Sequence, residues 1–215
     1  MNKFLERVDL QDDWSYCSSM PVDRTNPDTR QRLLEVGAHA FLHQGYHGAG
    51  LKEILDKAGV PKGSFYNYFD SKEDFASATI QHYASCMGGR LERALRGHTS
   101  PIAGLRAFFE SEASAFEKVD YSGGCLIANL GAELDDSPVC RETLQSSMNA
   151  YLQGLTAVVA SAQGVGEIRD DIEASELASL LSDAWEGAVI RMKVQKSLAP
   201  LHQVLNRFLC GFLKP

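Results

Sequence analysis

The sequence predicts an all-α protein of about nine helices, arranged as a small N-terminal domain followed by a larger helical one. Three observations support this fold class. Apolar residues recur every three or four positions through most of the chain, which is the period of an amphipathic helix. Glycine and proline residues stand where these periodic segments end. No segment shows the strict alternation of apolar and polar residues that is typical of a strand.

Composition narrows the class of protein. The chain has 215 residues and a net charge of −7. No apolar run approaches the roughly 20 residues that a membrane span requires, and acidic residues follow Lys3 where a signal peptide would be apolar. The cysteines form no C-x-x-C pair, so we expect neither a zinc site nor a disulfide framework: Cys17, Cys86, Cys125, Cys140 and Cys210. We therefore expect a cytoplasmic protein without a metal or a cofactor and without membrane contact.

The N-terminal segments read as an arm followed by three helices. Residues 1–25 have no sustained period, so we expect a loosely ordered arm. The sequence Asn26-Pro27-Asp28 is typical of a helix start, and Gly45 is placed to end that helix. A second helix is predicted over 51–58, before Gly59, and a third over 62–69.

The remainder of the chain also predicts helices. Asp70 or Ser71 is placed to cap a fourth helix that continues to about Gly97. Apolar stripes then predict helices over 101–119, 125–134, 138–163, 175–196 and 198–213. We place the domains at 26–75 and 76–215.

The stretch VPKGSFYNYFDSKEDF, residues 60–75, carries the strongest functional signal. Two short helices joined by a glycine turn are typical of a helix-turn-helix, which lays its second helix in the major groove of DNA. Phe65 and Phe69 are four positions apart, so we expect both in the core. Tyr66 and Tyr68 fall off that face, where their hydroxyl groups can reach a phosphate.

Candidate DNA contacts are the polar, basic or small residues of this unit: Lys52, Lys62, Gly63, Ser64, Tyr66, Asn67, Tyr68 and Lys72. Lys72 stands in the first turn of the next helix, where backbone N–H groups also favour a phosphate. Residues 24–75 hold seven bases and seven acids, so DNA binding must depend on a few placed groups. A helical binding module with a vestigial helix-turn-helix remains an alternative.

Residues 29–75 resemble the TetR-type one-component transcriptional repressors. The resemblance lies in Gly45-Tyr46, Ile54, Ala58-Gly59-Val60, Gly63, Tyr66, Tyr68-Phe69, Lys72 and Phe75. Gly50 departs from the Thr or Ser that often begins the second helix, which removes one expected phosphate contact. The resemblance implies a homodimer on a palindromic DNA operator, and a C-terminal domain that binds a ligand and dimerises. The apolar stripes of 175–196 and 198–213 fit a four-helix dimer interface, although both could instead pack within their own domain.

The segment SGGCLIANLGAEL, which contains Cys125, is the second informative place. If Ser122 caps a helix, Cys125 stands at its third position, where free N–H groups would lower the pKa of the thiol. This segment and Trp185-Glu186-Gly187-Ala188 resemble a branch of the family that answers electrophiles or small unsaturated acids. That branch includes the repressor of N-ethylmaleimide reductase and an acrylate-responsive repressor. The alternative is a buried structural cysteine.

A ligand pocket is expected among the helices of the larger domain, with candidate lining residues Cys125, Phe108, Phe109, Phe116, Asn129, Trp185 and Arg191. Arg191 could pair with a ligand carboxylate or with a nearby acid such as Glu133. His39, His43 and His47 are spaced by four, but Gly45 separates the last from the others, so we do not expect a metal site.

These observations favour a ligand- or thiol-controlled repressor that a small molecule or an electrophile releases from DNA. A thiol-dependent enzyme using Cys125 is the rival from another class, but the sequence shows no histidine or acid at a recognisable catalytic spacing from it. We therefore expect a protein that is not an enzyme.

Overall fold

The structure, a computed structural model, describes residues 29–214, so the predicted arm at 1–25 lies outside the described residues. Within this range there are nine α-helices and no strand, which confirms the all-α prediction. In chain order they are α2 (Thr29–Gly48), α3 (Leu51–Ala58), α4 (Lys62–Phe65), α5 (Lys72–Arg96), α6 (Pro101–Lys118), α7 (Leu126–Gly131), α8 (Pro138–Gly164), α9 (Ala174–Gln195) and α10 (Ala199–Val204). The last continues as a π-helix, η1 (Leu205–Phe212).

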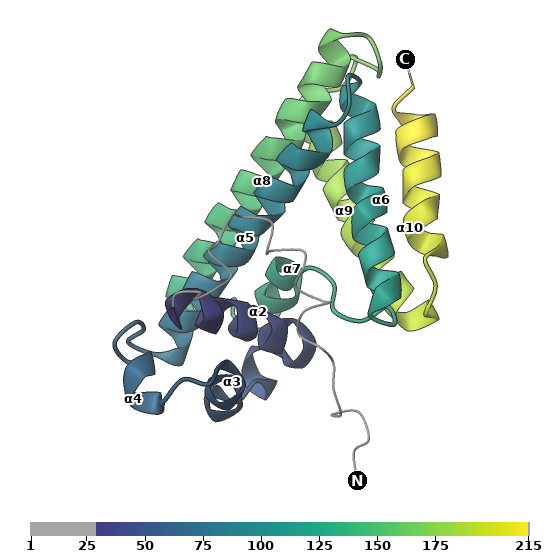
Figure 1. Cartoon of the computed structure of the whole chain (residues 1–215). Coiled ribbons are helices and arrows are strands. Elements are labelled where there is room, and N and C mark those ends of the chain that lie inside the picture. The colour runs from purple at the N-terminus through teal and green to yellow at the C-terminus, as the bar shows by residue number, and fades with distance from the viewer. Residues whose placement is uncertain (1–28, 215) are drawn as a thin grey trace.

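Helices α2, α3 and α4 form one end of the molecule (Figure 1). A cluster of phenylalanine rings packs among them. Phe75, at the start of α5, is the centre of this cluster. Its ring centroid lies 5.6 Å from that of Phe41, 5.5 Å from that of Phe65 and 4.9 Å from that of Phe69. The first turn of α5 therefore belongs to the core of the N-terminal unit, and α5 carries the chain from that unit into the larger domain.

Gly45 interrupts the helical path of α2, as the sequence predicts. Its backbone has φ 71° and ψ 175°, a conformation that is essentially restricted to glycine. Five further residues then lead to α3, which spans Leu51–Ala58 as predicted. Ser71 caps α5 by accepting a hydrogen bond from the backbone N–H of Asp74 at 3.0 Å.

The larger domain is built on α5 and α8, two long helices that lie side by side (Figure 1). A buried hydrogen bond of 2.7 Å between the hydroxyl groups of Ser77 and Thr143 joins them. Helix α6 packs against both, α9 packs against α8, and α10 packs on α9 at the outer edge. The short helix α7 lies between α2 and this bundle and contacts both. No helix among residues 29–214 is long and apolar enough to cross a membrane.

Candidate DNA-binding surface and ligand pocket

The aromatic run of residues 65–69 divides between core and surface as the helical period predicts. Phe65 and Phe69 are 0% and 2% exposed, whereas Tyr66 and Tyr68 are 50% and 39% exposed. The α-helix is shorter than expected and ends at Phe65. Beyond it the backbone makes turns, with the N–H of Tyr68 bonded to the Phe65 carbonyl at 2.9 Å. These turns present both phenol rings to solvent at one end of the molecule.

Most of the other candidate DNA contacts share this surface. Lys52, Lys62, Gly63 and Asn67 are exposed, and Ser64 is half-buried. Lys52 lies 3.7 Å from Asp56 on the open face of α3, where an ion pair contributes little and leaves the ammonium group available. The surface therefore offers ammonium, hydroxyl and amide groups without a broad positive field.

Lys72 is placed differently from the other candidates. Its Nζ donates a hydrogen bond to the Tyr46 carbonyl at 2.5 Å and lies 4.4 Å from the centroid of the Tyr46 ring. Burial lowers the pKa of Lys72, and the nearby Glu133 carboxylate opposes that shift. The ammonium group thus joins the first turn of α5 to the end of α2.

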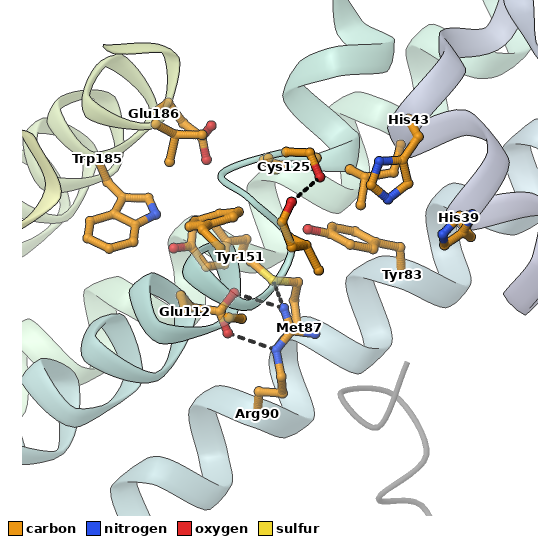
Figure 2. Close-up of a pocket in the computed structure, with 18 of the residues that line it drawn as sticks. His39, His43, Tyr83, Met87, Arg90, Glu112, Cys125, Tyr151, Trp185 and Glu186 are labelled. Carbon is orange, nitrogen blue, oxygen red and sulfur yellow. Dashed lines mark hydrogen bonds and ion pairs between the residues drawn. The ribbon is translucent and has the colours of Figure 1, made fainter. Parts of the chain in front are cut away.

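A cavity of about 100 Å³ lies where α2, α5, α6, α8 and α9 meet the loop before α7 (Figure 2). Its walls are mainly aromatic and aliphatic, with a few polar groups. The lining residues used below are His39, His43, Tyr83, Arg90, Phe108, Glu112, Phe116, Cys125, Tyr151, Trp185 and Glu186. The two histidines come from α2, so a helix of the N-terminal unit forms part of the pocket wall.

A buried ion pair closes one side of the cavity. Nε and Nη2 of Arg90 lie 2.9 Å and 3.1 Å from the two carboxylate oxygens of Glu112, and the side chains are only 11% and 12% exposed. Nη2 of Arg90 also lies 2.7 Å from the sulfur of Met87. Burial raises the pKa of Glu112, and the guanidinium group of Arg90 opposes this shift. Figure 2 shows the pair on one side of the labelled rings. The charges of Arg90 and Glu112 therefore largely compensate each other.

The prediction that Cys125 has a lowered pKa is wrong. Gly123 and Gly124 turn the chain with φ 80° and 108°, and Cys125 itself is the N-cap of α7. Ser122 instead donates to the Val119 carbonyl at 2.7 Å. Burial, and after it the Glu186 carboxylate, raise the pKa of Cys125 to about 12, because the N–H groups of Ala128 and Ile127 only partly offset these effects. The sulfur is thus a protonated thiol at neutral pH.

Glu186 is the carboxyl group beside this thiol. Burial raises its pKa to about 7, while a hydrogen bond from Cys125 and the field of Lys193 lower it and Glu112 raises it. Lys193 approaches the loop at the pocket edge, since its Nζ would lie 3.6 Å from a Cβ added at Gly124. No ion pair within 4 Å joins Glu186 to any residue of the described range.

The predicted lining residues divide into two groups. Phe108, Phe116, Cys125 and Trp185 line the cavity. Phe109 lies behind it, fully buried, with its ring centroid 4.6 Å from that of Trp185. Asn129 donates to the Gly123 carbonyl at 3.3 Å, so it shapes the loop and does not line the cavity. Arg191 is exposed on the opposite face of α9, in a groove beside α10, so neither a pocket ligand nor Glu133 is its partner.

The other lining residues were not predicted from the sequence, among them His39, His43, Tyr83, Arg90, Glu112, Tyr151 and Glu186. The rings of His39 and His43 lie 4.5 Å apart, so the spacing of four did signal a shared face. Among residues 29–214 no group of three potential metal ligands is assembled. Both His39 and His43 line the cavity.

Glu133, which follows α7, links the pocket region to the end of α2. Its Oε2 accepts a hydrogen bond from the backbone N–H of His47 at 3.1 Å. Its Oε1 lies where a side chain at Gly45 would stand, 2.2 Å from an added Cβ. Since α7 begins at Cys125 in the pocket, one short helix connects the cavity wall with the junction between α2 and α3.

The C-terminal helices expose large apolar side chains on the face that points away from the pocket. Leu180, Ile190 and Val194 of α9 and Phe212 of η1 are exposed. They accompany a shallow groove between α9 and α10, which includes Val204 and Phe208. Large exposed apolar side chains gathered on one pair of helices are typical of a protein–protein interface.

Two family models match separate parts of the chain. Residues 33–79 match a family model described as bacterial regulatory proteins, tetR family, and residues 101–208 match one described as a tetracyclin repressor-like C-terminal domain. The HTH-type transcriptional repressor DhaR of Mycobacterium sp. (strain GP1) is 35% identical over 82% of this chain and 88% of its own length. The transcriptional regulator AcuR of Cereibacter sphaeroides is 34% identical over 83% of this chain and 82% of its own length. The crystal structure of the reduced form of E. coli NemR is 30% identical over 84% of this chain and 95% of its own, with a TM-score of 0.78.

Proposed function

The chain belongs to the TetR family of bacterial regulatory proteins. From this premise we propose that it is a homodimeric repressor, and that a small molecule in the pocket controls its affinity for a palindromic operator. The family is one of transcription regulators, so the thiol-dependent enzyme considered from the sequence is set aside. The observation that carries the proposal is the shared wall: His39 and His43, on a helix of the N-terminal unit, line the cavity of the larger domain.

The exposed apolar face of α9 and α10–η1 supports a dimer. Two copies that bury Ile190, Val194 and Phe212 against each other would form a four-helix interface. A two-fold dimer presents two identical helix-turn-helix units, so the operator is a palindrome with half-sites about one helical turn, roughly 34–36 Å, apart. We keep residues 26–75 as the DNA-binding domain and 76–215 as the ligand-binding and dimerisation domain.

Contact with DNA is assigned to the exposed tip around α4. Lys62 and Gly63 lead the recognition helix, where the side chain reaches a base edge or a phosphate and the glycine lets the backbone approach. Tyr66 and Tyr68 are exposed beside them and donate their hydroxyl groups to phosphates. Each basic contact to a phosphate adds to the salt dependence of binding.

Control by the pocket follows from the elements that it shares with the DNA-binding domain. A ligand that displaces the α2 wall, or shifts α7 and with it Glu133, changes the angle of α2 and the spacing of the recognition helices. The coupling required is modest, about 1–3 kcal/mol, which changes operator affinity roughly 5- to 150-fold.

Non-covalent binding is the mode that the pocket favours. An electrophile reacts with a thiolate, and a thiol whose pKa is about 12 supplies very little of it at neutral pH. Cys125 therefore acts as a wall of the cavity and as a hydrogen-bond donor to Glu186. The Cys125→Ser variant should keep both roles and should still release DNA when the ligand binds.

Selection from a random duplex library tests the proposal. The protein should enrich a palindromic site, and a gel shift should give binding that weakens steeply with salt. Lys62→Ala and Tyr66→Phe should each lose affinity, and Lys62→Ala should also lower the salt slope by about one. Arg96→Ala, at the far end of α5, is the matched control and should bind as the wild type does. Equal binding by all three variants would overturn the assignment of contacts.

A further inference from the structure

We propose that the pocket selects a small organic cation, a protonated amine of a few non-hydrogen atoms, with Glu186 as its anchor and the surrounding rings as its walls. This inference depends on the proposed ligand control, because it names the chemical class of the controlling molecule. It differs from the expectation of a carboxylate ligand that the sequence suggested through Arg191.

The charges of the lining disfavour an anion. Arg90 lines the cavity, and its Nε and Nη2 both donate hydrogen bonds to the carboxylate oxygens of Glu112. A ligand carboxylate could recruit Arg90 only by displacing Glu112, which would leave a buried carboxylate without its partner. It would also lie in the same small space as Glu186.

Glu186, by contrast, has capacity for a cation. In the described part of the chain its hydrogen-bond partner is the Cys125 thiol, and Lys193 acts on it only from beyond ion-pair distance. An ammonium group within the cavity would supply the close counter-charge that Lys193 does not. The histidines lie on the opposite side of the cavity in Figure 2, next to Tyr83, and so do not compete for the same carboxylate.

The rings reinforce this choice. Tyr83, Phe108, Phe116, Tyr151 and Trp185 all line the cavity. Burial raises the pKa of Tyr83 and of Tyr151 well above the usual value, so both phenol rings stay neutral. Aromatic faces are negative and attract a desolvated cation, and groups of such rings are the usual site of ammonium recognition. An anion gains nothing from the same surface.

The volume sets the size of the ligand. A single water molecule needs roughly 10–15 Å³ of cavity volume, so a cavity of about 100 Å³ accommodates a molecule of several non-hydrogen atoms. Short alkylamines are of this size. Larger cations would have to displace the ring walls.

Three probes of nearly equal shape test the proposal: n-propylamine as a cation, propionamide as a neutral molecule and propionate as an anion. None of them reacts with a thiol. Isothermal titration of the full chain without DNA should give a dissociation constant for the amine about tenfold lower than for either other probe. Propionate or propionamide binding as tightly as the amine, or no binding by any probe at the highest concentration that the assay tolerates, would overturn the proposal.

The anchor is tested by Glu186→Gln, with Glu117→Gln on the exposed face of α6 as the matched control. The first variant should lose about tenfold in amine affinity and the second should lose none. An unchanged affinity in Glu186→Gln would contradict the role of the carboxylate. If Glu186→Gln does not fold, the wild-type probe series decides alone. These titrations contain no DNA, so they test the cation site separately from the repressor. A chain that binds the amine but binds no operator would contradict the proposed repressor and would still support the cation site.

Discussion

Replacing Gly45 with alanine should destabilise the protein strongly, and the structure gives two separate reasons. At φ 71° and ψ 175° the backbone is in a region that costs a residue with a Cβ about 1–3 kcal/mol. The added Cβ would also lie 2.2 Å from Oε1 of Glu133, so that side chain must move and release the N–H of His47. Losing this hydrogen bond costs about 1 kcal/mol. We expect a total of about 2–4 kcal/mol.

Thermal and urea unfolding at fixed protein concentration measure this cost, which corresponds to a fall in Tm of roughly 5–15 °C for a chain of this length. Gly88→Ala is the matched control, since a Cβ there meets no atom within 4 Å and lies inside helix α5. It should be neutral or stabilising by up to about 1 kcal/mol.

A Glu133→Ala background separates the two causes. It removes the collision and the hydrogen bond but leaves the backbone conformation of Gly45 unchanged. Gly45→Ala should therefore cost about 1 kcal/mol less in that background than in the wild type. If Gly45→Ala is as stable as Gly88→Ala, the account of the α2–α3 junction is wrong. If its cost is equal in both backgrounds, Glu133 does not occupy the space assigned to it.

Other consequences of the pocket can be measured without knowing its ligand. Arg90→Met should lower the free energy of unfolding in urea by about 3–5 kcal/mol, because it leaves the buried Glu112 carboxylate without its partner. Adding Glu112→Leu should recover much of that loss. A double variant less stable than Arg90→Met would contradict the pairing. The folded pKa of Glu186, about 7, exceeds its ordinary value of 4.5, so its contribution to stability is full below about pH 4.5 and is lost as the pH rises through about 7. The stability of Glu186→Gln relative to wild type should consequently increase across that window, and a flat difference would refute the raised pKa. Alkylation of Cys125 by iodoacetamide at neutral pH, followed by mass spectrometry, should be much slower in the native protein than in urea, and equal rates would show that the thiol is not protected.

Local signals in the sequence were sufficient for the elements of the fold. The spacing of Phe65 and Phe69 predicted their burial, and the same period predicted that Tyr66 and Tyr68 face solvent. Gly45 and the cap Ser71 ended and began helices as their backbone chemistry requires. Each of these features depends on residues within a few positions along the chain.

The pocket could not be predicted in the same way because its properties arise from segments that are distant in sequence. Cys125 stands at a helix N-terminus, where a lowered pKa is expected, but burial and Glu186 dominate that local effect. Arg191 interrupts an apolar stripe, yet its own side chain is exposed in the groove beside α10, whereas Val189 lines the pocket. His39 and His43 line the cavity only because α2 packs near α7 and the larger domain.

The central claim is that the state of the pocket determines how well the recognition helices fit DNA. Filling the cavity through Ala115→Trp tests it directly, because Ala115 lines the cavity on α6 and the indole occupies the space of a ligand. Fluorescence anisotropy with the selected operator should show an affinity roughly 5- to 150-fold weaker than wild type, while Ala115→Ser, which leaves the cavity open, binds normally. A folded, dimeric Ala115→Trp protein that binds the operator as tightly as wild type would contradict the account.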